Sequence, residues 1–154
     1  MGEGKAIIER YTMTVTQVSI AVDNAPGSLY RASSILEKEH INIKAIMASS
    51  GLNPVQVHMI VDDPDRAVNV LGMNKFTVTT KEVIAVATPD HPGGLNAVLR
   101  PLIEARVNID AMYPFIYLKG DEAVLILDVD KTSEAKEALN KHWVRTYGSE
   151  IYKS

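Results

Sequence analysis

The sequence contains no cysteine, which excludes disulfide bonds, thiolate zinc sites, iron–sulfur clusters and cysteine nucleophiles. It also lacks an excess of basic residues. Its 16 Lys and Arg face 19 Asp and Glu, so the formal net charge is −3, and the overall positive charge typical of nucleic-acid-binding proteins is missing. No apolar run approaches the ~18 residues that a membrane-spanning helix needs, and residues 1–13 show no signal-peptide core. We therefore expect a cytoplasmic protein that binds neither nucleic acid nor a membrane.

An internal repeat is the first positive feature of the 154-residue chain. At an offset of 66 positions, residues 18–46 and 84–112 share eight identical pairs: Ala21/Ala87, Pro26/Pro92, Gly27/Gly93, Leu29/Leu95, Leu36/Leu102, Asn42/Asn108, Ile43/Ile109 and Ala45/Ala111. Chance similarity between two strand–turn–helix pieces is the alternative. The order of elements that follows the matched block also agrees, which favours two copies of one structural unit.

Each repeat has the hydrophobic pattern of strand–helix–strand–strand–helix–strand. In the first repeat we expect a strand from Val18, a helix over 28–39, strands over 43–49 and 55–61, a helix opened by Asp63-Pro64, and a strand over 76–80. In the second we expect a strand from Val83, a helix over 93–105, strands over 109–118 and 123–129, a helix opened by Thr132, and a strand over 143–147.

This order predicts an α+β fold of two ferredoxin-like βαββαβ repeats with antiparallel sheets. Residues 1–17 form an N-terminal extension and the start of the first strand, and the repeats occupy 18–80 and 81–154. The link Lys81-Glu82 has no flexible linker composition, so we expect the last strand of one repeat to run into the next and the two to pack as one unit. Pro101 conflicts with this pattern, and it predicts either a kink or a later helix start.

Few side chains are arranged in a pattern typical of a catalytic, metal or cofactor site. No histidine has a second histidine three or four positions away, and no GxSxG, P-loop or GxGxxG motif occurs. Asp128 and Asp130 have the spacing to ligate a cation, but we expect them to close a strand and cap the following helix. We therefore expect no catalytic residue, no metal and no cofactor.

The turn between the first strand and the first helix is the most informative segment. It occurs twice, at residues 23–29 and 89–95, with Pro-Gly at the start of each helix and Asn24 or Asp90 two residues before the proline. Backbone N–H groups at a helix start favour an anion such as a carboxylate. Asn24 and Asp90 either cap the helix or accept a hydrogen bond from a ligand's ammonium group. From these residues alone a plain capped turn is an equal alternative.

Both repeats resemble the ACT domain, an amino-acid-binding regulatory module, in the pattern (Asp/Asn)-x-Pro-Gly-x-Leu, then a helix, then (Ile/Val)-Asn-Ile. The resemblance implies that a free amino acid binds where the first loop of one repeat meets the second strand of a paired repeat. The loop residues would be Asn24, Ala25, Pro26, Gly27, Ser28 and Leu29, and Asp90, His91, Pro92, Gly93, Gly94 and Leu95. The second-strand residues would be Met47, Ala48 and Ser49, and Met112, Tyr113 and Phe115.

The two sites need not be equivalent, because Ala25 and His91 differ in size and polarity. Tyr113 and Phe115 either line a larger pocket in the second repeat or belong to the core. We expect the second loop to bind more strongly, since ionised Asp90 makes a charge-assisted bond to an ammonium group and Asn24 does not.

The resemblance implies a non-catalytic sensor that forms a homodimer or larger assembly and regulates a partner enzyme or regulator of amino-acid metabolism. A structural or oligomerisation protein with vestigial sites is the main alternative. An acylphosphatase-like enzyme would need an arginine in the first loop, and neither 23–29 nor 89–95 contains one. An RNA-binding sheet would need aromatic residues on the third strands, which have none.

Overall fold

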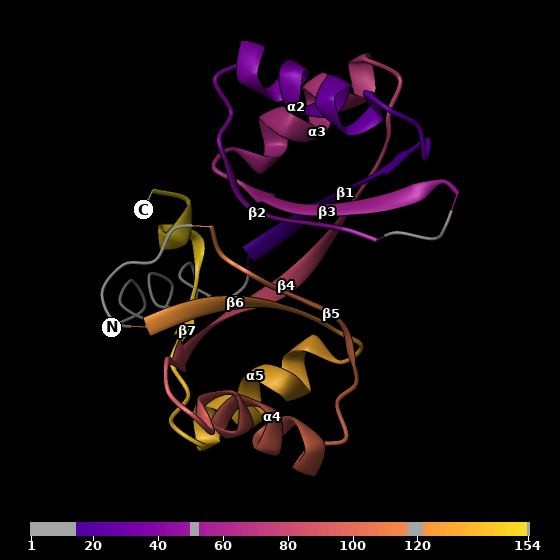
Figure 1. Cartoon of the computed structure of the whole chain (residues 1–154). Coiled ribbons are helices and arrows are strands. Elements are labelled where there is room, and N and C mark those ends of the chain that lie inside the picture. Colours follow the sequence, from indigo (N-terminus) through magenta and orange to yellow (C-terminus); the bar gives the residue numbers. More distant parts are fainter. Residues whose placement is uncertain (1–14, 50–52, 117–121, 154) are drawn as a thin grey trace. The chain divides into compact units, whose positions relative to one another are not determined.

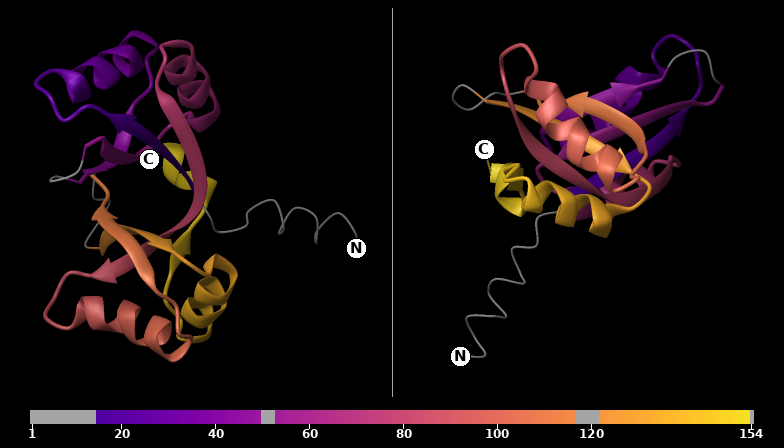
Figure 2. Two further views of the ribbon diagram at one scale, coloured as in Figure 1. Left: turned by 90° about the vertical axis from the view of Figure 1, so that its right-hand side faces the viewer. Right: turned by 90° about the horizontal axis from the view of Figure 1, so that it is seen from below.

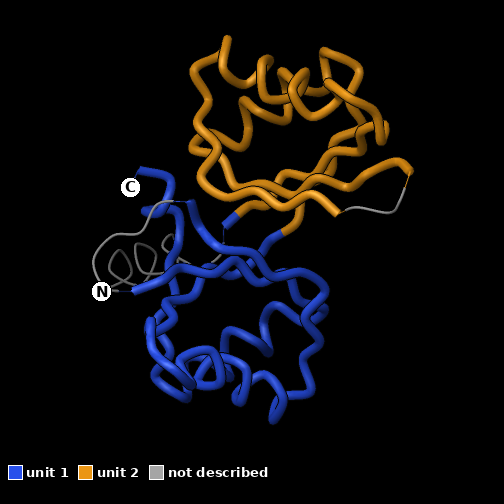
Figure 3. The backbone as a smooth tube through the Cα atoms, in the orientation of Figure 1, with its two compact units in different colours: residues 1–15, 82–154 blue, residues 16–81 orange. Residues whose placement is uncertain are grey.

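The structure, a computed structural model, describes residues 15–49, 53–116 and 122–153. The chain divides into two compact units, which Figure 3 shows in different colours. Unit 2 comprises residues 16–81, and unit 1 comprises residues 82–154 together with 1–15.

Unit 2 contains the first repeat. Its elements are β1 (Val15–Val22), α2 (Ser28–Lys38), β2 (Ile43–Ala48), β3 (Val55–Val61), α3 (Pro64–Met73) and the first part of β4 (Thr77–Pro89). The strand order is β2-β3-β1-β4, and β3 pairs antiparallel with both β1 and β2. Figure 1 shows α2 and α3 together on one face of these strands.

Unit 1 contains the second repeat. The rest of β4 is followed by α4 (Gly94–Glu104), β5 (Ile109–Pro114), β6 (Glu122–Val129), α5 (Thr132–Lys141), the short strand β7 (Thr146–Tyr147) and a 3₁₀-helix over Ser149–Lys153. β6 pairs antiparallel with β5 and β4, and β4 pairs antiparallel with β7. Helices α4 and α5 lie side by side on one face of these strands (Figures 1 and 2). The predicted pair of βαββαβ repeats with antiparallel sheets is confirmed.

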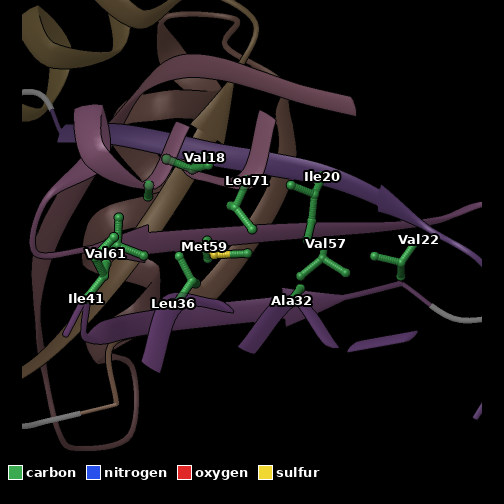
Figure 4. Packing of buried hydrophobic residues seen from close by; sticks show 11 residues of the cluster. Val18, Ile20, Val22, Ala32, Leu36, Ile41, Val57, Met59, Val61 and Leu71 are labelled. Carbon is green, nitrogen blue, oxygen red and sulfur yellow. The ribbon is translucent and has the colours of Figure 1, made fainter. Parts of the chain in front are cut away.

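Alternating strand residues build the core of each unit between sheet and helices. In unit 2, Val18, Ile20 and Val22 of β1 form one cluster with Leu36 of α2 and Leu71 of α3, and Figure 4 shows Leu71 beside Val18 and Ile20. The equivalent cluster of unit 1 contains Ile84, Val86, Val98, Leu102 and Leu139. Because full burial of such a side chain contributes about 1.5–3 kcal/mol, each cluster fixes which face of its sheet the helices cover.

The four α-helices in the described residues end in the same way. The carbonyl of a buried leucine accepts a hydrogen bond from the N–H five residues later: Leu36 from Ile41, Leu71 from Phe76, Leu102 from Val107 and Leu139 from Val144. The residue before each donor has a left-handed backbone, with φ of 55° at His40, 68° at Lys75, 54° at Arg106 and 61° at Trp143. This is the Schellman motif, built here on residues other than the usual glycine.

Most predicted boundaries hold, and a few do not. Pro101 lies inside α4, which begins at Gly94, so the predicted later start of this helix is wrong. The strand expected over 143–147 is reduced to Thr146–Tyr147, because Trp143 instead ends α5. Lys81 and Glu82 lie within β4, so the last strand of one repeat does continue into the next. The extension before Val15 and the turn positions 51–52 and 119–121 lie outside the described residues.

Candidate functional site

Two glycines with a left-handed backbone form the N-caps of the first helix of each repeat. Gly27 has φ 87° at the start of α2, and Gly93 has φ 84° at the start of α4. A side chain would find open space at either position, so the positive φ is the feature that favours glycine. The two loops therefore share one backbone conformation, as the repeated Pro-Gly predicted.

Neither helix start is capped by a side chain. The N–H of Ser28 donates to the Ala25 carbonyl at 3.3 Å, and that of Gly94 donates to the His91 carbonyl at 3.0 Å. The next two N–H groups of each first turn have no acceptor within a helix. By contrast, the carboxylate of Asp63 caps α3 by accepting from the Arg66 N–H at 3.2 Å.

The side chains of Asn24 and Asp90 do not cap the two helices, so capping is not their role. Both side chains are exposed. His91 is exposed as well, and its Nδ1 donates to the Pro92 carbonyl at 2.9 Å, so the imidazole is held against its own loop. The helix dipoles and outward N–H groups of α2 and α4 thus favour a negatively charged group at each loop.

Gly94, the residue after the second N-cap, is constrained by a close contact with the end of β4. It is buried, and a Cβ there would collide with the carbonyl oxygen of Pro89. Its lack of a side chain therefore allows the start of α4 to approach the end of β4 closely. The half-buried Ser28 occupies the equivalent position in unit 2.

Within each unit, the end of the second strand lies at the same end of the sheet as the loop. In unit 2, Ala48 pairs with Val57, which pairs with Ile20 on its other side. In unit 1, Pro114 pairs with Leu125, which pairs with Val86. Loop and strand end are therefore two strand spacings apart, about 10 Å, and they do not meet within one unit.

The second-strand residues differ in exposure. Ala48 and Met112 are exposed, and Met47 and Ser49 are partly buried. Tyr113 and Phe115 are buried, with exposed fractions of 2% and 4%. Burial, and secondly the negative charge of Asp128, raise the pKa of the Tyr113 phenol well above its usual range. Both aromatic side chains are thus core-like in their exposure.

The sequence analysis missed Thr88. Its side chain is 6% exposed, and its hydroxyl is the one buried side-chain polar atom without a hydrogen-bond partner among the described residues. Because side chains alternate along a strand, Thr88 lies on the same face of β4 as the core residues Ile84 and Val86, directly before the second loop. The repeat alignment could have identified it, because the polar Thr88 stands where the first repeat has the apolar Val22.

A polar cluster beside the second loop was also missed. Glu122 pairs with Pro89 in the sheet register, and its carboxylate lies 3.7 Å from the Arg145 guanidinium and 3.4 Å from the Tyr147 hydroxyl. The Arg145 guanidinium also lies over the Tyr147 ring, 5.2 Å from its centroid. The repeat pattern did not indicate these residues, because β7 is only two residues long.

The aspartates at the strand ends hold the backbone. The Asp130 carboxylate accepts from the Asn108 N–H at 2.9 Å, and the Asp62 carboxylate accepts from the Asn42 N–H at 3.0 Å. The N-cap of α5 is Lys131, so the prediction that an aspartate caps this helix is wrong. Among the described residues no group of three acidic, histidine or cysteine side chains is arranged to hold a metal ion, and no helix is long and apolar enough to cross a membrane.

Comparison with known proteins agrees with this architecture. Residues 13–146 match the model of the ACT domain pair. No curated protein matches the sequence. The chain is similar to the crystal structure of protein BT0572 from Bacteroides thetaiotaomicron, with 29% identity and a TM-score of 0.85 over 92% of this chain and 98% of that one.

The fold is also shared with regulatory subunits of aspartate kinase. The ligand-free subunit from Thermus thermophilus is 12% identical, with a TM-score of 0.62 over 86% of this chain and 95% of that one. The subunit from Thermus flavus is 10% identical, with a TM-score of 0.56 over 86% and 98%. The family match covers most of the sequence, and the chain belongs to the ACT domain pair family.

Proposed function

We propose that this ACT domain pair is a non-catalytic sensor that binds a free amino acid at the loops before α2 and α4 and regulates a partner protein. The observation that carries the proposal is the repeated helix start. Gly27 and Gly93 adopt the same left-handed conformation, and neither helix has a side-chain cap. The outward N–H groups then suit the carboxylate that every amino acid carries.

The ligand's ammonium group would be recognised by Asn24 or Asp90. Both side chains are exposed, and neither caps its helix. Asp90 favours the second loop, because a charge-assisted hydrogen bond is roughly twice as strong as a neutral one. Thr88 supplies a further difference between the loops, since Val22 replaces it in unit 2.

The ligand contacts from Met47, Ala48, Ser49, Met112, Tyr113 and Phe115 are part of the proposal. Each second strand lies about 10 Å from the loop of its own unit. A shared site therefore needs the second strand of a paired repeat, and we propose that the working form is a homodimer or larger assembly. Burial of Tyr113 and Phe115 favours the more exposed Met112 as the contact from the second repeat.

A thermal-shift panel of the twenty amino acids tests the function. A ligand at 100 times its Kd raises apparent stability by about 2.7 kcal/mol, and we expect a shift for one or a few amino acids. A flat panel contradicts sensing and favours a structural protein with vestigial sites. Sedimentation at several concentrations tests the assembly, and a 16.9 kDa monomer at all of them contradicts it.

Two matched pairs of variants locate the site by calorimetry with the best ligand. Asp90→Asn should cost about 1–3 kcal/mol, and Asn24→Ala should cost less. The reverse order assigns the first loop as the stronger site.

Asn96→Pro and Tyr30→Pro each delete one N–H in a first turn, where proline is tolerated. A substitution of Gly93 itself would be a poorer test, because φ of 84° strains any residue with a side chain there. A folded Asn96→Pro protein with unchanged affinity contradicts carboxylate binding at α4.

A further inference from the structure

The outer surface of the two helices in unit 1 contains a groove. One hollow of about 350 Å³ lies between α4 and α5 and has Glu104, Glu134, Glu137 and Lys141 among its lining residues. We call it the acidic groove. Its other lining residues include Pro101 and the small Ala105 and Ala138. A second hollow of about 350 Å³ shares Pro101 and His142 with it and extends to Gly93, the N-cap of the second loop.

The equivalent surface of unit 2 carries an ion pair. Arg66 of α3 and Glu39, the C-cap residue of α2, are joined at 2.8 Å. The bounds of α2 and α4 give an offset of 66, and those of α3 and α5 an offset of 68. At these offsets Glu134 replaces Arg66 and Ala105 replaces Glu39. The bridge is therefore absent by composition in unit 1. Unit 2 has a hollow of about 530 Å³ on the same surface, with Ile35, Lys38 and Asn74 among its lining residues, so the hollow belongs to the fold and its acidic lining is particular to unit 1.

The charge of this surface differs between the two units. Lys38 and Asn69 of unit 2 become Glu104 and Glu137 in unit 1. The Glu104 carboxylate lies 3.1 Å from the His142 imidazole. Lys141, the basic residue among those that line the acidic groove, cannot balance three glutamates. The surface thus attracts a positively charged group at neutral pH.

Trp143 follows His142 directly and is 94% exposed. Its backbone has φ 61°, a left-handed conformation that costs a residue with a side chain about 1–2 kcal/mol. The position therefore holds a bulky aromatic side chain that gains no packing within the described residues and is strained as well. Tryptophan is one of the side chains enriched in the energetic centres of protein–protein interfaces. The equivalent residue in unit 2 is Lys75.

We propose that the acidic groove and Trp143 form a docking surface for a positively charged segment of a partner protein that also carries apolar side chains. The basic side chains lie among Glu104, Glu134 and Glu137, and an apolar side chain packs on the Trp143 indole. This surface does not depend on amino-acid binding. The adjoining hollow reaches Gly93, however, so a partner bound at the docking surface lies next to the second loop.

Synthetic peptides test the surface. Trp143 is the only tryptophan of the chain, so tryptophan fluorescence reports on this surface alone. The probe is an amphipathic lysine–leucine peptide labelled with fluorescein. Matched glutamate–leucine and lysine–serine peptides are the controls. We expect the lysine–leucine peptide to shift the Trp143 emission to shorter wavelength and to bind at least tenfold more tightly, by anisotropy, than either control. Equal binding of all three, or no shift of the emission, overturns the proposal.

Variants that copy unit 2 provide the decisive comparison. Glu134→Arg combined with Ala105→Glu installs the bridging pair of unit 2, and Trp143→Lys installs the residue found at Lys75. Each should weaken peptide binding at least tenfold while the circular dichroism spectrum is unchanged. Glu37→Lys, an exposed charge reversal on α2, should leave binding within twofold. If Glu37→Lys weakens binding as much as the groove variants, the attraction is non-specific and the proposal fails.

Self-association is measured in the same series without peptide. A shift of the Trp143 emission that depends only on protein concentration would assign the surface to a second copy of the chain and overturn a partner protein. The amino-acid panel is independent of this result. The docking surface can thus fail while amino-acid binding stands, and the reverse also holds.

Discussion

Asn108 and Asp130 are joined by two hydrogen bonds that close the end of a strand. The Asn108 N–H donates to the Asp130 carboxylate at 2.9 Å, and the Asp130 N–H donates to the Asn108 carbonyl at 3.1 Å. Asn42 and Asp62 form the same pair in unit 2, at 3.0 and 3.1 Å. The shared asparagine of the repeats therefore marks the position where the strand after the first helix is tied to the end of the third strand.

Removal of this carboxylate should weaken the fold slightly. We expect Asp130→Ala to lower the free energy of unfolding by about 0.5–1.5 kcal/mol, the net value of one hydrogen bond. Asp130→Asn keeps an oxygen acceptor at the same place and should lose less. Urea denaturation measures both, and equal losses would show that charge and not the hydrogen bond matters.

Glycine should stabilise the strained end of α5. Trp143 has a positive φ and almost no buried surface, so Trp143→Gly should raise the free energy of unfolding by about 1 kcal/mol. Trp143→Ala keeps a Cβ at the same φ and should leave stability nearly unchanged. A destabilised glycine variant in thermal unfolding would mean that the indole contributes to the folded state.

The same substitution should have opposite effects at two glycines. Gly94→Ala places a Cβ against the Pro89 carbonyl oxygen, and we expect a loss of about 1–3 kcal/mol from overpacking. Gly72→Ala lies in α3, where a Cβ meets open space, and should gain up to about 1 kcal/mol through helix propensity. Chemical denaturation of both variants checks the pair, and a neutral Gly94→Ala would refute the close approach of the loop.

Alkaline pH should destabilise unit 1 through Tyr113. Burial and Asp128 raise the pKa of its phenol in the folded state, whereas the unfolded chain ionises near 10. The stabilisation is complete below pH 10 and is lost as pH rises further, because only the unfolded state then releases the proton. Tyr113→Phe should make the stability curve flatter above pH 10. Tyr30→Phe, which removes an exposed phenol, is the control.

The sequence alone determined the elements and their order. Alternating residues such as Val18, Ile20 and Val22 form a strand because one side of it is buried, and this pattern is local. Asp63-Pro64 opens α3 as predicted, since capping involves residues three positions apart. The ACT pattern was readable for the same reason: Pro-Gly and the Ile-Asn-Ile segment act within a few residues of the chain.

Tertiary structure decided the features that depend on residues far apart in sequence. Gly94 is small because Pro89 passes over it, and Pro101 is tolerated within α4 although local propensity opposes it. Thr88 and Val22 occupy equivalent strand positions, yet only burial shows that the Thr88 hydroxyl has no partner among the described residues. The acidic lining of the groove arises because Glu104 and Glu134, about 30 residues apart in sequence, lie on two neighbouring helices, where unit 2 has Lys38 and Arg66. Distance in space, which no local pattern encodes, sets each of these interactions.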